Sequence, residues 1–147
     1  MDTRKLFEKL KERAMTILKQ DKFLVPVIFC VKDENVVMFP VPFIDEVMRV
    51  AHWVAMALET VKPNCLIMFL DGKLWKMGAE EPKRYKECLV GLLADFEHKL
   101  FEVHAILYKR RFGRIKYGKE LVAPLDRGAV AEVVKNYANS YKPAGVV

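Results

Sequence analysis

The chain has 147 residues and a net charge of +6, with 52% hydrophobic and 30% charged residues. This length and composition allow one domain with a sizeable hydrophobic core, so they exclude a disordered protein and a small scaffold that depends on disulfides or a structural metal. We therefore expect a single domain over residues 1–147, with a frayed tail over 142–147.

The cysteines indicate a reducing compartment. They lie far apart, each inside an apolar run, without a CxxC pair, so we expect buried free thiols and a cytoplasmic protein. The three are Cys30, Cys65 and Cys88. The first residues lack the apolar core of a signal peptide. Gln20 is the single glutamine and only four residues are asparagine, a balance typical of heat-adapted proteins, so a thermophilic source is a further expectation.

The first third of the chain predicts a helix followed by two strands. Apolar residues recur at helical spacing from Thr3 to Gln20, and Asp2 or Thr3 can cap the start of this helix. The run Phe23–Val31 predicts a strand, which Pro26 places at an edge or next to a bulge. A turn at residues 33–35 then leads into a second strand over Val36–Phe39 that Pro40 ends.

Residues Asp45–Thr60 predict a second helix with a broad apolar face. Its polar stripe is narrow, which indicates a helix in the centre of the fold or against a partner subunit. The surrounding stretch, Phe43–Val61, has the length of a membrane span, but charged residues interrupt it, and each would be costly in lipid. The residues that interrupt this stretch are Asp45, Glu46, Arg49, His52 and Glu59.

The middle of the chain predicts further strands. Cys65–Leu70 is a continuous apolar strand, and Asp71-Gly72 is typical of a tight turn. After that turn Lys73–Met77 can pair back, which would place Trp75 over the sheet. Residues 78–84 then form a polar loop.

Residues 87–107 fit either a helix or two strands joined by a turn at residues 96–99, and we favour the strands. Two short strands follow over Arg114–Tyr117 and Glu120–Ala123, separated by Gly118. Asp126 can cap a last helix. The predicted order is α-β-β-α-β-(β)-β-β-β-α, an α+β domain with an antiparallel or mixed sheet, a buried central helix and a helix at each end. This order resembles the roadblock and longin group of profilin-like modules, which present a sheet and helices to protein partners and often dimerise.

No motif for catalysis or for a cofactor is present. The glycine patterns that cradle phosphates are missing, and no metal or cofactor is expected. His98 and His104 lie near acidic residues, but on a helix or a hairpin they diverge, which disfavours a shared metal. His52 lacks an aligned carboxylate or nucleophile. Apolar neighbours of Cys65 and Cys88 raise a thiol's pKa, which disfavours a reactive thiolate.

One segment stands out by its charge. Residues 109–119 hold six basic residues and no acidic one, which equals the whole net charge of the protein. Aromatic residues interleave with these charges, as binding of a single-stranded nucleic acid or another polyanion requires. The candidate binding residues are Tyr108, Lys109, Arg110, Arg111, Phe112, Arg114, Lys116, Tyr117 and Lys119. The alternative is an ordinary hairpin whose charges keep it solvated and deter aggregation.

Three functions remain open from the sequence. The first is a small non-enzymatic binding or assembly module that forms a homodimer, which the apolar excess of the second helix and the central strands favours. The second is a nucleic-acid-binding protein that uses residues 108–119, with an acidic protein partner as a variant. An enzyme with a site assembled from distant residues is the third possibility.

Overall fold

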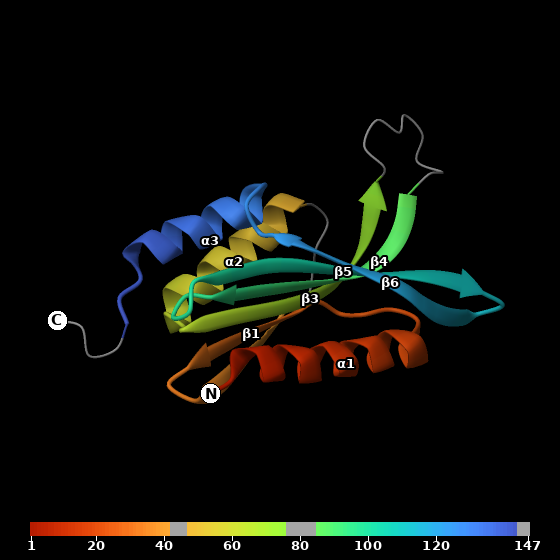
Figure 1. Cartoon of the computed structure of the whole chain (residues 1–147), viewed down its shortest axis with the longest axis horizontal. Coiled ribbons are helices and arrows are strands. Elements are labelled where there is room, and N and C mark those ends of the chain that lie inside the picture. Colours follow the sequence, from red (N-terminus) through yellow and green to blue (C-terminus); the bar gives the residue numbers. More distant parts are fainter. Residues whose placement is uncertain (42–46, 76–84, 144–147) are drawn as a thin grey trace.

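The computed structural model describes residues 1–41, 47–75 and 85–143. Its elements are α1 (Thr3–Asp21), β1 (Val27–Lys32), β2 (Asn35–Pro40), α2 (Val47–Val61), β3 (Cys65–Trp75), β4 (Tyr85–Asp95), β5 (Leu100–Arg111), β6 (Arg114–Pro124) and α3 (Ala129–Ser140). The strands form one antiparallel sheet in the order β2-β1-β3-β4-β5-β6. Helix α1 covers one face of the sheet, and α2 and α3 cover the other (Figure 1). The predicted α+β class is confirmed.

Helix α1 begins as the sequence indicates, because the Asp2 side chain accepts a hydrogen bond from the Lys5 backbone N–H. Its apolar face packs on β3, β4 and β6. Phe7 and Leu18 are fully buried there, and the Phe7 ring stacks on Phe69 with 5.3 Å between ring centroids. The helix is therefore part of the core on this side of the sheet.

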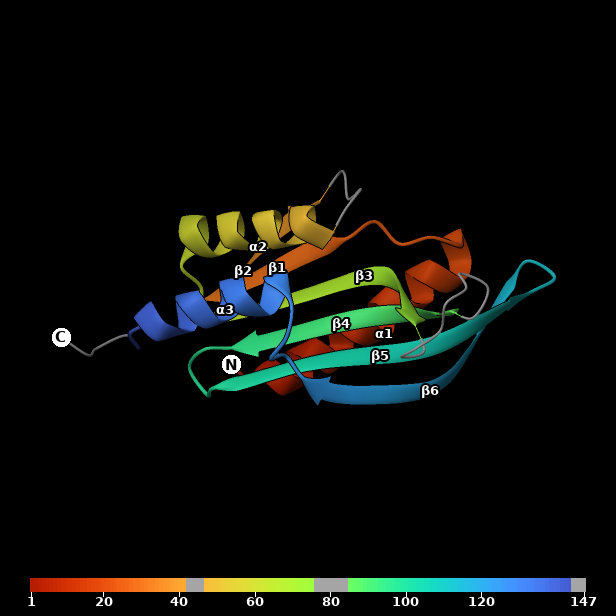
Figure 2. The same cartoon turned by 90° about the horizontal axis from the view of Figure 1, so that it is seen from above.

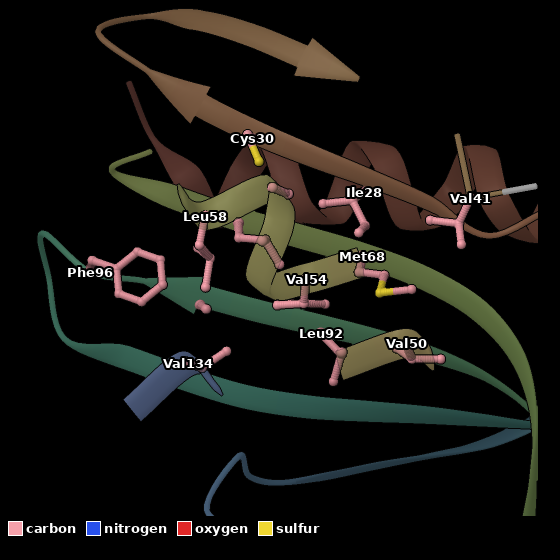
Figure 3. Close-up of a cluster of buried hydrophobic side chains, with 13 residues drawn as sticks. Ile28, Cys30, Val41, Val50, Val54, Leu58, Met68, Leu92, Phe96 and Val134 are labelled. Atoms are coloured by element: carbon pink, nitrogen blue, oxygen red, sulfur yellow. The ribbon is translucent and has the colours of Figure 1, made fainter. Parts of the chain in front are cut away.

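A second apolar cluster lies between the sheet and the helices α2 and α3. Val54 and Leu58 of α2 lie over Met68 of β3 and Leu92 of β4, and Val134 of α3 borders the same cluster (Figure 3). On α2, His52, Glu59 and Thr60 are exposed to solvent, and the side chain of Arg49 lies outside the described residues. The described part of the predicted polar stripe thus lies on the outer surface of a helix that buries its opposite face. Among the described residues, no helix is long and apolar enough to cross a membrane.

Four local predictions are wrong. Asp126 does not cap the last helix, because α3 follows Gly128 as its N-cap residue and has no side-chain cap. Asp71-Gly72 forms no turn, since β3 runs through both residues and pairs with β4 along its whole length. Gly118 does not separate two strands, because β6 is continuous and absorbs the residue in a bulge opposite β5. Pro26 does not mark an edge: β1 begins at Val27 and lies between β2 and β3. Residues 76 and 77 and the side chain of Trp75 lie outside the described residues.

The ambiguous segment 87–107 consists of two antiparallel strands. β4 and β5 pair from Cys88 with Leu107 to Asp95 with Leu100, and residues 96–99 form the turn between them. The Asp95 carboxylate accepts hydrogen bonds from the Thr3 hydroxyl and from the His98 backbone N–H. The turn is therefore tied to the start of α1, and the strand interpretation is confirmed.

Candidate polyanion-binding hairpin

The basic segment forms the end of the hairpin made by β5 and β6. This end extends past the helices and away from the rest of the sheet (Figure 2). Arg111 pairs with Arg114, so Phe112 and Gly113 are the two residues of the turn. Both have a positive φ, of 51° and 73°, as in the type I′ turn that suits the twist of a hairpin. Phe112 and Gly113 thus form the tip of the hairpin.

The pleat of the hairpin divides the basic segment between two faces. Residues directly opposite each other in an antiparallel pair project to the same side, and successive residues alternate. Tyr108 pairs with Tyr117 and Arg110 pairs with Ile115, and these four side chains project to the side of α1. Lys109 and Arg111 project to the opposite side, together with their partners Lys116 and Arg114.

The two tyrosines on the side that faces α1 are bonded to other parts of the protein. Tyr108 is 4% exposed, and its hydroxyl donates to the Asp71 carboxylate. Tyr117 is half-buried, and its hydroxyl donates to the backbone carbonyl of Met15 in α1. The two rings meet edge to face, with 6.2 Å between centroids. Both hydroxyls are thus bonded within the protein, and the Tyr108 ring is buried.

Arg110 is held by the fold as well. Its guanidinium donates to the Glu87 carboxylate at 3.2 Å and to the Lys22 backbone carbonyl at 2.9 Å, and lies 3.7 Å from the Asp71 carboxylate. Burial disfavours the charged form, but the bond to Glu87 and the contacts with Tyr108 outweigh it, so the Arg110 pKa is raised. Burial and the bond to Asp71 likewise raise the pKa of Tyr108. Tyr108, Arg110 and Tyr117 therefore stabilise the hairpin from within.

The other side of the hairpin presents charge without compensation. Five basic side chains are exposed there, and no ion pair among the described residues involves any of them. They are Lys109, Arg111, Arg114, Lys116 and Lys119. We call this set the basic face. By strand alternation, β5 and β6 place all their acidic residues on the α1 side, and half-buried Leu107 and Leu121 lie beside the basic face.

Two pairs within the basic face oppose like charges directly. Lys109 faces Lys116, and Arg111 faces Arg114 across the two strands. Such pairs destabilise an antiparallel ladder, whereas opposite charges at the same positions would stabilise it. The strand rise of about 3.3 Å per residue separates the two pairs by about 7 Å along the hairpin. The charges keep this edge of the sheet from pairing with another, but their direct opposition adds repulsion that a bound polyanion would neutralise.

Phe112 occupies the tip with its ring wholly in solvent, at 102% relative exposure. A positive φ is unfavourable for a residue with a bulky side chain. The other non-glycine residues with positive φ among the described residues are polar or charged. They are Lys22, Asp33, Glu34, Lys62 and Lys99. Phe112 is thus both conformationally costly and without a packing role, which makes it a candidate for contact with a ligand.

His98 and His104 are held in separate polar contacts. The His98 ring lies 2.8 Å from the Asp95 carboxylate, and this hydrogen bond raises the His98 pKa. His104 is buried between Glu102 at 2.8 Å and Glu120 at 3.1 Å, against the ring of Phe7. His52 is exposed on α2. In the part of the chain that the structure describes, no three His, Cys, Asp or Glu residues are placed to hold a metal ion.

Two carboxylates beside His104 also anchor α1 to the sheet. Arg4 donates to both oxygens of Glu102, at 2.9 and 3.0 Å. Lys11 contacts Glu120 at 3.1 Å, and hydrogen bonds such as this one lower the Glu120 pKa against the effect of burial. The network joins Arg4 and Lys11 to β5 and β6, so its role in this structure is to dock the helix.

The three cysteines are free and buried, as the sequence indicates. Burial raises the pKa of all three thiols, to about 12 for Cys30. A thiol that stays protonated at neutral pH is a poor nucleophile. The cysteines therefore belong to the core.

Comparison of the chain with protein-family models, with curated proteins and with solved structures yields no match. The resemblance to roadblock and longin modules accordingly remains one of element order. The sequence correctly places the basic residues on a hairpin, but it does not separate Arg110 from its neighbours. Two features separate Arg110 from its neighbours: the alternation of side chains along β5, and the carboxylates of Glu87 in β4 and Asp71 in β3.

Proposed function

We propose that this protein is a non-enzymatic module that binds nucleic acid through the basic face of the β5–β6 hairpin. Two pairs of directly opposed like charges carry the proposal: Lys109 with Lys116, and Arg111 with Arg114. On this face of the hairpin, β5 and β6 place no acidic residue. Phosphate groups spaced along a chain neutralise such a double row, and their release of counterions supplies the binding free energy.

The apolar contacts of the hairpin favour nucleic acid over a structureless polyanion. The exposed Phe112 ring extends the basic face at its tip, and aromatic rings bind unpaired bases by stacking. Leu107 and Leu121 offer further half-buried apolar surface beside the charges. A single strand, whose bases are accessible, uses both features, so we take single-stranded RNA or DNA as the ligand.

The test is binding of a labelled single-stranded oligonucleotide as a function of salt. If all five side chains of the basic face contact phosphates, the slope of log K against log salt is about −3 to −4, since each phosphate contact contributes about −0.7. The triple variant Arg111→Ala, Arg114→Ala, Lys116→Ala should flatten this slope by about two units. Arg110 is left intact because its loss would strand Asp71 and Glu87.

A matched control removes three charges elsewhere. Lys5, Lys9 and Arg13 are exposed on α1 and take part in no ion pair among the described residues. Their triple replacement by alanine changes the net charge equally and should leave most of the slope in place. Equal effects of the two triple variants would show that net charge alone governs binding. Binding to anionic lipid vesicles without binding to oligonucleotides would replace nucleic acid by a membrane surface.

A further inference from the structure

The two edge strands of the sheet differ in how they are protected. The edge strand β6 carries Arg114, Lys116, Lys119 and Glu120, and charged residues of this kind prevent one sheet edge from pairing with another. The opposite edge, β2, has no charged residue between Asn35 and Pro40. Its apolar side chains are exposed on both faces: Val36 at 44%, Val37 at 39% and Met38 at 61%. Such a strand is a template for pairing with another strand.

The backbone of β2 shows which groups await a partner. Asp33 and Glu34 both have positive φ and form a two-residue turn, so Lys32 and Asn35 are the first hydrogen-bonded pair of the β1–β2 hairpin. Hydrogen-bonded and non-hydrogen-bonded pairs then alternate along the hairpin. Val36 with Val31 and Met38 with Phe29 are non-hydrogen-bonded pairs. The Val31 carbonyl indeed turns away from β2, to the Asn64 N–H.

The N–H and C=O groups of Val36 and Met38 consequently point outward from the edge. They form a short repeat of donor and acceptor that matches itself when a second β2 approaches antiparallel. With a two-fold axis at Val37, Val36 of each copy lies opposite Met38 of the other, and all four outward N–H groups of the two strands receive an acceptor. Pro40, which has no N–H, lies outside these four bonds.

From this pattern we infer that a second copy of the chain pairs with β2 about a two-fold axis at Val37, forming a continuous twelve-stranded antiparallel sheet across a homodimer. In this register Glu34 lies opposite Pro40 and Asn35 opposite Phe39, so no like charges meet along the strand. Helix α2 lies over this edge, whereas α1 lies under the other strands (Figure 2). The two α2 helices therefore flank the axis and enlarge the interface.

The sequence predicts that α2 lies in the centre of the fold or packs against a partner subunit. In the inferred dimer, β2 forms the centre of the interface and α2 lies beside it. Dimerisation through β2 does not depend on nucleic-acid binding, because β6 and the basic face lie at the other edge of the sheet. Sedimentation equilibrium or light scattering of the full chain should show a dimer whose dissociation follows mass action. A chain that stays monomeric at high concentration overturns the inference. It is overturned as well if the chain stays monomeric and an added extended apolar peptide pairs with β2.

Charge exchange at the axis tests the position of the interface. Val37→Lys places two lysines face to face and should weaken dimerisation about a hundredfold, and Val37→Glu should do the same. An equimolar mixture of the two variants should recover a heterodimer, which also shows that each variant is folded. If both variants dimerise as tightly as the wild type, or if the mixture does not associate, β2 is not the interface.

Cross-linking tests the register. Since Val36 faces Met38 of the other copy, a mixture of Val36→Cys and Met38→Cys chains should form an intermolecular disulfide under mild oxidation. Each variant alone has its new cysteines on a diagonal about 7–8 Å apart, beyond the usual Cα separation for a disulfide. The native thiols are buried and do not compete. Cross-linking of each variant alone, as strong as in the mixture, would refute this register.

Discussion

Replacement of Phe112 by asparagine should change stability and nucleic-acid binding in opposite directions. Phe112 is the first residue of the type I′ turn, and its φ of 51° lies in the left-handed region. This region costs most residues about 1–2 kcal/mol, and asparagine is among those that tolerate it. The turn would become Asn-Gly, the sequence that type I′ hairpins favour.

The magnitude follows from the exposure of the ring. Because Phe112 is wholly in solvent, its removal forfeits no buried apolar contact. We therefore expect the free energy of unfolding to rise by about 0.5–1 kcal/mol, which corresponds to about 1–4 °C in Tm for a chain of this size. Loss of one stacked base should weaken binding of a single-stranded oligonucleotide by about 1–3 kcal/mol, or roughly fivefold to 150-fold.

Thermal unfolding followed by circular dichroism gives the first value, and fluorescence anisotropy with a labelled oligonucleotide gives the second. Phe112→Tyr keeps the aromatic ring and the turn, and serves as the control that should retain binding. A lower Tm for the asparagine variant would show that the ring packs against the protein. Unchanged oligonucleotide affinity would remove Phe112 from the interface.

Three further predictions concern stability and the core. Gly91→Ala should destabilise the fold by about 1–3 kcal/mol in chemical denaturation, because its Cβ would lie 2.9 Å from one phenylalanine ring and 3.0 Å from another; equal stability would mean that the rings yield freely. The raised His98 pKa implies stabilisation that is full below the ordinary value of 6.5 and lost as pH rises through the folded value. The lowered Asp95 pKa implies stabilisation that is present above 3.8 and lost as pH falls through the folded value. His98→Gln should therefore lower Tm most between pH 3.8 and pH 6.5, where both groups are charged. A Tm difference between variant and wild type that does not vary with pH would contradict this. Finally, the buried thiols should react with an aromatic disulfide reagent only after unfolding, and fast reaction of the native protein would show that the core opens.

The sequence predicts the helices and most strands because their apolar periodicity reflects burial. The prediction fails at Asp71-Gly72. This dipeptide is typical of a turn, but here Gly72 is needed for packing of β3 against β4. A Cβ at Gly72 would lie 2.9 Å from the Val90 side chain of β4, so the glycine makes room for packing within a long strand. The partner strand is far away in sequence, and no local pattern contains that information.

At the candidate site, too, the sequence lacks information on contacts between distant strands. The count of charges in residues 109–119 identifies the segment, and the tip at Phe112 follows from the adjacent glycine. The separation of Arg110 from the basic face follows from strand alternation, which is a local property. Its neutralisation by Asp71 and Glu87, however, depends on the register of two other strands. Sequence reasoning could thus find the segment but not the subset of residues that remains uncompensated.

The docking of α1 has a consequence for the order in which the protein is made. The first helix is joined to the last strand by the contact of Lys11 with Glu120, 109 residues apart, and by the bond from Tyr117 to Met15. During synthesis from the N-terminus, the apolar face of α1 with Phe7 and Leu18 emerges long before β4 and β6 exist to cover it. The nascent chain must therefore keep this face from aggregating until about residue 120 has left the ribosome, and the native core on this side closes as one of the last steps.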